Sequence, residues 1–237
     1  MIDKDSILLF DIDDTLYLRN VPFIRACEEC LSGRIQLDWD RLFKARNIYS
    51  DAILSRQKEQ QISNETLYYL RMKQALADFG QDITPQEVEV FEESYRRFQG
   101  DIQLYDGYEE LFEELKARGN TMGLITNGNV PMQEAKIRVL GLERWIPREH
   151  WFITENMCAV KPQEPLYRQV EQLLGVTDPS RFWYIGDNYP MDVEGAVHAG
   201  WHAIWFNANG DLLPASVRYH PEGRVTNTRE LRRFLLE

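Results

Sequence analysis

The sequence has few cysteines and no surplus of basic residues. Three cysteines in 237 residues, an odd number in a long chain, do not predict a framework of disulfide bonds. The 27 Lys and Arg residues are outnumbered by 38 Asp and Glu residues, which gives a formal net charge of -11. Nucleic-acid-binding proteins neutralise phosphates with basic side chains, so this balance argues against a nucleic-acid partner. We expect a protein of the reducing cytoplasm.

Long hydrophobic runs and internal repeats are also missing from the sequence. No apolar stretch approaches the roughly 20 residues that a membrane-spanning helix needs, so we expect no membrane partner. Residues 1–6 are polar and charged, which is not the pattern of a signal peptide. A hydrophobic content of 43% is enough for a buried core. The length fits one large domain, or one domain that carries an insert.

Short apolar runs alternate with amphipathic segments in much of the chain. The apolar runs, which predict strands, are residues 6–11, 121–126, 151–154, 182–186 and 203–206. The amphipathic segments, which predict helices, are residues 108–118, 132–140, 164–174 and 192–199. Alternation of this kind predicts an α/β fold, with a Rossmann-like parallel sheet flanked by helices on both faces.

One long segment interrupts this alternation. Residues 20–99 show no strand pattern, but they contain helical patterns at 40–57, 64–79 and 85–98, the last with Thr84 as its expected N-cap. We therefore predict an α/β core domain of residues 1–18 and 101–237, with an inserted all-helical domain of residues 19–100. Cys27 and Cys30 have a C-x-x-C spacing in this insert. Zinc sites need about four ligands, so helix packing is the simpler interpretation of the pair.

Two aspartates directly follow the first predicted strand. Asp11 and Asp13 are two residues apart, so both side chains lie on one face of an extended strand end. Neighbouring carboxylates repel unless a cation joins them or one is protonated. The pair is either a charged turn before the next helix or part of a magnesium site. In the second case one carboxylate is a nucleophile and the other a general acid/base.

Three further polar motifs also follow predicted strands. Thr126-Asn127-Gly128 is either an ordinary turn or a loop whose N–H groups bind an anion. Lys161, before a proline and a helix, is either a surface side chain or a group that neutralises a phosphate. Asp187 and Asp192 are candidate oxygen ligands of the type that Mg²⁺ prefers, although Asp192 could instead be an N-cap or a first-turn charge of the next helix. Ligands of open parallel sheets bind at the carboxyl ends of the strands, where all these motifs are expected.

Taken in order, these motifs resemble those of the haloacid dehalogenase-like (HAD) superfamily. The matching positions are Asp11, Asp13 and Thr15 in D-x-D-x-T, then Thr126, then Lys161, then Gly186, Asp187 and Asp192. The resemblance covers about 150 residues of the predicted core. The position and helical character of the insert are similar to those of family members with a helical cap.

The resemblance implies a role for each matching residue. Asp11 is expected to attack phosphorus and form an aspartyl phosphate, and Asp13 to protonate the leaving oxygen and then activate water. Mg²⁺ is expected to bind the Asp11 carboxylate, the Asp13 backbone carbonyl and Asp187. Asp192 is expected to orient a metal-bound water or Lys161. Thr126, the backbone of Asn127 and Gly128, and Lys161 are expected to hold the phosphoryl oxygens.

These roles predict a phosphatase that acts on a small phosphorylated metabolite. Family members that cleave carbon–halogen bonds generally lack the second aspartate, so Asp13 favours phosphate ester hydrolysis over dehalogenation. A sugar-phosphate mutase and a non-enzymatic binding protein with the same fold are the alternatives. A nucleoside 5'-monophosphate is the leading substrate. Candidate side chains for its recognition, each of which could instead serve packing or solvation, are Tyr17, Arg19, Arg25, Tyr68 and Arg71.

Overall fold

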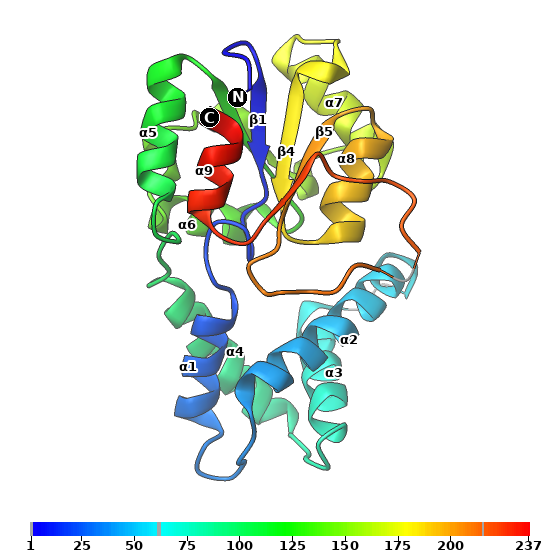
Figure 1. Cartoon of the computed structure of the whole chain (residues 1–237). Coiled ribbons are helices and arrows are strands. Elements are labelled where there is room, and N and C mark those ends of the chain that lie inside the picture. The colour runs from blue at the N-terminus through cyan, green and yellow to red at the C-terminus, as the bar shows by residue number, and fades with distance from the viewer. Residues whose placement is uncertain (1, 61–62, 215) are drawn as a thin grey trace. The chain divides into compact units, whose positions relative to one another are not determined.

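A six-stranded parallel sheet forms the centre of the larger of two compact units (Figure 1). The computed structural model describes residues 2–60, 63–214 and 216–237. The strand order is β3-β2-β1-β4-β5-β6. The strands are β1 Ile7–Phe10, β2 Thr121–Thr126, β3 Trp151–Ile153, β4 Phe182–Gly186, β5 His202–Phe206 and β6 Gly223–Val225. The order reverses between β1 and β4, and in such sheets the reversal point is where ligands bind.

Helices pack against both faces of this sheet. On one face, Phe10 of β1 packs edge-on against Tyr108 and Phe112 of α5 (Tyr108–Arg118), and α9 (Thr228–Leu236) lies beside α5. On the other face, α7 (Glu164–Leu174) and α8 (Gly195–His198) bury a cluster that includes Leu166 and Tyr184. The buried residues of β1 face both layers and are apolar throughout, as expected for a covered parallel sheet. The predicted α/β fold is confirmed.

Most predicted elements of this unit agree with the structure to within a few residues. Helices α5 and α7 have the predicted bounds, and α6 spans Val130–Val139. The predicted helix 192–199 differs, because a π-helical turn, Tyr189–Glu194, precedes the short α8. Neither β6 nor α9, which complete one edge of the sheet and one helical layer, was predicted from the sequence.

The second compact unit, Arg19–Ile102, contains only helices among its described residues. They are α1 Asn20–Cys30, α2 Trp39–Gln60, α3 Asn64–Ala77 and α4 Pro85–Gln99. Thr84 caps α4 in a capping box with Glu87, as the sequence predicted for the N-cap. Cys27 is buried in the core of this unit and Cys30 is half-buried. The larger unit comprises Met1–Leu18 and Gln103–Glu237.

A buried ion triad lies inside the helical unit. Arg46 Nη2 and Arg71 Nη2 donate to the same oxygen of Glu92, at 3.1 and 2.7 Å. Arg46 also lies over the rings of Phe23 and Tyr95. The triad is therefore a polar network within an apolar core, and such networks stabilise only when they stay paired.

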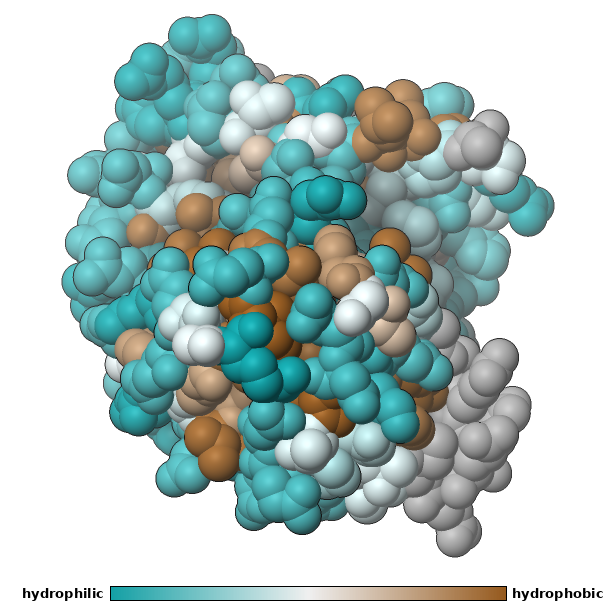
Figure 2. All heavy atoms as spheres, turned by 90° about the horizontal axis from the view of Figure 1, so that it is seen from below, coloured by the Kyte–Doolittle hydropathy of each residue, from teal (hydrophilic) through white to brown (hydrophobic). Residues whose placement is uncertain are grey.

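Seen from below Figure 1, the surface is mostly hydrophilic, with hydrophobic residues visible between the polar ones (Figure 2).

Candidate active site

Asp11, Lys161 and Asp192 form the centre of the candidate site. Asp11 follows β1, and its N–H donates to the Ile185 carbonyl of β4 at 2.9 Å. The Lys161 ammonium donates to Asp11 Oδ1 at 2.5 Å, to Asp192 Oδ1 at 2.7 Å and to the Tyr184 hydroxyl at 3.2 Å. All three groups of the ion cluster are almost fully buried. An ammonium has three protons to donate, and each has a partner here.

The electrostatic environment shifts the pKa values of Asp11 and Lys161. Burial raises the pKa of Asp11, the Lys161 ammonium lowers it, and the Asp192 and Asp13 carboxylates raise it again, to about 7. Burial lowers the pKa of Lys161, but Asp11 and Asp192 outweigh burial and raise it above the ordinary value. The cluster carries more carboxylates than ammonium groups, so it attracts a cation.

A glycine next to Asp187 makes room for the Asp192 carboxylate. A Cβ at Gly186 would lie 2.4 Å from Asp192 Cγ, closer than atoms can pack. The other Asp192 oxygen, Oδ2, accepts from the Asn188 N–H at 2.9 Å. Asp192 thus has one oxygen on Lys161 and one on the backbone of its own loop. This arrangement suits a residue that orients Lys161.

Three carboxylates converge at this edge of the sheet. One oxygen atom from each of Asp11, Asp187 and Asp192 lies within 4.8 Å of the others. The Thr15 hydroxyl lies 3.4 Å from Asp187 Oδ1, and the Trp205 indole donates to the Asp187 carbonyl at 2.7 Å. Mg²⁺ takes oxygen ligands and needs one or two protein carboxylates. The donor set therefore fits Mg²⁺, with Asp11 and Asp187 better available than Asp192.

The loop after β2 is tied to the Lys161 loop. The Asn127 side chain accepts from the Lys161 N–H at 3.1 Å and donates to the Lys161 carbonyl at 3.4 Å. The Gly128 N–H donates to the Thr154 hydroxyl at 3.3 Å, and Thr126 is buried at the end of β2. The three predicted phosphate-binding residues therefore lie beside Lys161, with the Asn127 side chain holding that loop.

Asp13 has its own set of partners, which the sequence did not indicate. Lys136 Nζ donates to Asp13 Oδ1 at 2.7 Å and to Oδ2 at 2.8 Å. The Tyr17 hydroxyl donates to Oδ1 at 2.5 Å, and Gln133 Nε2 lies 3.4 Å from Oδ2. Lys136 and Gln133 are polar residues buried on α6, at positions that sequence patterns usually assign to the solvent side. No local signal relates them to a residue more than 100 positions earlier.

The candidate residues for substrate recognition have structural partners within their own units. Tyr17 belongs to the larger unit and is buried against Asp13. Arg25 pairs with Asp101 at 2.7 Å and lies over the Phe98 ring. Arg71 pairs with Glu92 and lies over the Tyr68 ring, and Arg19 lies over Phe43. These contacts favour packing, or for Arg25 a surface ion pair, the alternatives that the sequence left open.

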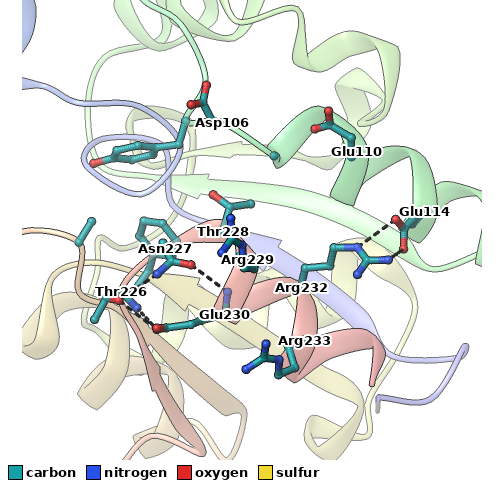
Figure 3. Close-up of a pocket in the computed structure, with 14 residues that line it drawn as sticks. Asp106, Glu110, Glu114, Thr226, Asn227, Thr228, Arg229, Glu230, Arg232 and Arg233 are labelled. Atoms are coloured by element: carbon teal, nitrogen blue, oxygen red, sulfur yellow. Dashed lines mark hydrogen bonds and ion pairs between the residues drawn. The ribbon is translucent and has the colours of Figure 1, made fainter.

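A groove lies elsewhere in the larger unit, between α5 and α9 (Figure 3). Its volume is about 1000 Å³. Asp106 and Glu110 lie on one wall and Arg229 on the other, and Arg232 forms a two-bond ion pair with Glu114. Tyr105 and Phe206 also line it. The groove contains none of the predicted catalytic residues.

Comparison with known proteins agrees with this geometry. A family model described as haloacid dehalogenase-like hydrolase matches residues 6–200. The matched range includes every residue of the carboxylate and lysine cluster. The chain is a haloacid dehalogenase-like hydrolase.

Curated relatives of this HAD hydrolase include two with named phosphatase activities. It is 29% identical to phosphoserine phosphatase of Thermus thermophilus, over 98% of this chain and 99% of that protein. It is 25% identical to the pyrimidine 5'-nucleotidase PynA of Streptococcus pneumoniae, over 84% of this chain and 83% of that protein. The names of both relatives describe hydrolysis of phosphate esters.

Solved structures share the fold at lower identity. The HAD-hydrolase YfnB of Bacillus subtilis, described as bound to magnesium, has a TM-score of 0.75 and 23% identity, over 98% of this chain and 99% of that one. A structure described as a dehalogenase has a TM-score of 0.79 and 19% identity over the full length of both chains. This HAD hydrolase therefore shares its fold with a structure described as a HAD-hydrolase and with one described as a dehalogenase. No helix in the described ranges is long and apolar enough to cross a membrane.

Proposed function

We propose that this HAD hydrolase is a Mg²⁺-dependent phosphomonoester hydrolase that acts through an aspartyl phosphate on Asp11. The observation that carries the proposal is the pairing of the buried Asp11 with Lys161 at 2.5 Å, beside a second carboxylate, Asp13, that Lys136 holds. A nucleophile, a cation next to it and a separate acid/base group are the parts that phosphoryl transfer requires.

The chemistry follows from these groups. An oxygen of Asp11 attacks phosphorus, and the bond from phosphorus to the leaving oxygen breaks while Asp13 gives that oxygen a proton. In the second half, Asp13 takes a proton from water as the water oxygen bonds to phosphorus, which releases phosphate and restores Asp11. Lys161, held by Asp192, neutralises charge on the phosphoryl oxygens. Mg²⁺, held by Asp11, Asp187 and the Asp13 carbonyl, would supply further positive charge there.

Asp13 also supports a phosphatase over a dehalogenase. An expelled halide needs no proton, whereas an alkoxide leaving group does. Tyr17, Gln133 and Lys136 each donate to Asp13 and hold it in place. A dehalogenase has no need of an acid/base group held in this way. The named activities of the curated relatives support the same choice.

The proposed substrates are small phosphorylated metabolites, with nucleoside 5'-monophosphates first. The nucleotidase relative supports the nucleotide, and the phosphoserine phosphatase relative makes phosphoserine the second candidate. We propose that the helical unit acts as the cap over this site and selects among these esters. A sugar-phosphate mutase would return the phosphoryl group to the sugar, so its product would be an isomer of the substrate.

The test is phosphate release from a panel of phosphomonoesters, with Mg²⁺ and with EDTA. We expect release that requires Mg²⁺ and falls below detection in Asp11→Asn, with the fold intact by circular dichroism. The panel contains nucleoside 5'-monophosphates, phosphoserine and sugar phosphates, and a 2-haloacid with halide detection serves as the competing substrate. Halide release without phosphate release would replace the phosphatase by a dehalogenase. Turnover retained in Asp11→Asn would refute the covalent route.

A further inference from the structure

Lys136 is a buried cation bonded to both oxygens of Asp13. It projects from α6 (Val130–Val139), its residue exposure is 6%, and its Nζ lies 2.7 and 2.8 Å from the two oxygens. A surface lysine gains little from an ion pair, whereas a buried ammonium must be compensated by close partners. Lys136 therefore depends on Asp13, and Asp13 is held from the helix side by Lys136.

Two other side chains also approach the Asp13 carboxylate as donors. The Tyr17 hydroxyl donates to Oδ1 at 2.5 Å, and Gln133 Nε2 lies 3.4 Å from Oδ2. Gln133 Nε2 also donates to the Asn127 carbonyl at 3.2 Å. A Cβ at Gly128 would lie 2.6 Å from Gln133 Nε2, so the glycine leaves the space that Gln133 occupies. Gln133 thus connects Asp13 with the loop that follows β2.

The same carboxylate must be placed accurately for the proposed reaction. A general acid acts only within hydrogen-bond reach of the oxygen that it protonates. A displacement of about 1 Å can lower the rate roughly 100-fold. An aspartate beside a turn has several rotamers of similar energy, and contacts from α6 and Tyr17 select one of them.

We propose that Lys136 is a positioning residue that holds the Asp13 carboxyl group where it reaches the leaving oxygen. This inference rests on the proposed phosphatase function. In this proposal Lys136 donates hydrogen bonds and transfers no proton. The proton that reaches the leaving oxygen comes from Asp13, and Asp13 regains one from the attacking water.

The test compares two esters with different leaving groups. The leaving group of an alkyl phosphate needs a proton, whereas p-nitrophenolate leaves without one. In Lys136→Met, kcat/KM for the alkyl ester should fall about 10–100-fold, and kcat/KM for p-nitrophenyl phosphate should fall by no more than a few fold. The comparison uses kcat/KM because hydrolysis of the aspartyl phosphate, in which Asp13 also acts, is common to both esters and affects kcat and KM together. Lys116→Met, at an exposed lysine on α5 that donates to the Arg144 carbonyl, is the matched control.

A double-mutant cycle separates positioning from a purely structural role. In an Asp13→Asn background, Lys136→Met should cause no further ester-dependent loss, since the group that it positions is gone. Tyr17→Phe removes one donor from the same oxygen and should cause a smaller loss of the same kind, which provides a test even if Lys136→Met does not fold. Equal losses on both esters, or losses that add in the Asp13→Asn background, would overturn the inference. A wild type that hydrolyses neither ester would instead overturn the proposed function.

Discussion

Gly186→Ala adds one carbon atom, and we expect it to displace Asp192 and lower activity. The new Cβ would lie 2.4 Å from both Asp192 Cγ and Asp192 Oδ2, and 2.5 Å from Asp192 Cβ. These atoms belong to a side chain with both oxygens bonded, one to Lys161 at 2.7 Å and one to the Asn188 N–H at 2.9 Å. Asp192 must therefore move, and Lys161 must lose or weaken one of its two carboxylate partners.

The magnitude follows from two contributions. Overpacking a buried position costs about 1–3 kcal/mol of stability, and a hydrogen bond to a charged group contributes about 1.5–3 kcal/mol. Because the strain is relieved partly by giving up the bonds, the total is about 2–5 kcal/mol. In a protein of this length each kcal/mol lowers Tm by about 2–4 °C, so we expect Tm to fall by roughly 4–20 °C. A misplaced Lys161 should lower kcat/KM for a phosphomonoester by about 10²–10³-fold.

Two alanine variants at other glycines separate the two effects. At Gly123, on β2, a Cβ would lie 2.6 Å from Leu9 Cδ2 and 3.0 Å from the His150 carbonyl, so Gly123→Ala overpacks the sheet without touching the carboxylates. At Gly33 a Cβ would meet no atom within 4 Å. Thermal unfolding and initial rates are measured below the lowest Tm. We expect Gly123→Ala to lose stability but keep kcat/KM within a few fold, and Gly33→Ala to change neither.

A Gly186→Ala protein with wild-type Tm and wild-type kcat/KM would show that the predicted clash with Asp192 does not occur. A loss of activity no larger than that of Gly123→Ala would show that the contact of Gly186 with Asp192 matters for packing and not for Lys161.

Three other predictions concern charge. Lys161→Met removes the cation that Asp11 and Asp192 share and should lower kcat/KM about 10²–10³-fold, with Lys116→Met unchanged in the same assay. Burial and neighbouring carboxylates raise the pKa of Asp11 to about 7 in the metal-free protein, so protons compete with Mg²⁺ for Asp11 below that pH. Calorimetry should therefore show Mg²⁺ binding about tenfold weaker at pH 6 than at pH 8. Equal affinities would contradict the assignment of Asp11 as a ligand. Burial raises the pKa of Glu92, but Arg46 and Arg71 outweigh burial and hold the pKa below its ordinary value. The charged Glu92 therefore stabilises the folded protein at pH values above its ordinary pKa, and this stabilisation is lost as the pH falls through the lowered pKa. Glu92→Gln should cost about 3–5 kcal/mol by urea unfolding at pH 7, a difference that shrinks in acid; a constant difference would contradict the role of the charge.

The sheet and the position of the site followed from the sequence because their signals are local. Apolar runs such as residues 121–126 and 182–186 predicted β2 and β4 with their observed bounds. A parallel sheet brings its carboxyl ends to one edge, so Asp11, Lys161 and Asp192 were expected together and lie within hydrogen-bond distance. The order of strands was not needed for that prediction.

The parts that the sequence did not predict depend on contacts between distant residues or on very short elements. Strand β6 has three residues, too few to show a pattern. Helix α9 does have a readable signal, since Asn227 caps it and Leu231 and Leu235 are buried on one face, but it was not among the predicted helices. Lys136 and Gln133 are ordinary helix-forming residues, and only the fold relates them to Asp13.

The most direct test of the central claim is to find where the phosphoryl group is attached during turnover. The protein is mixed with substrate and Mg²⁺, quenched, and reduced with borohydride, which converts an acyl phosphate to an alcohol. Peptide mass spectrometry then locates the reduced side chain. We expect reduction at Asp11, dependent on substrate and on Mg²⁺, and none in Asp11→Asn. Reduction at another carboxylate, or phosphate release during turnover with no reduced residue, would contradict it.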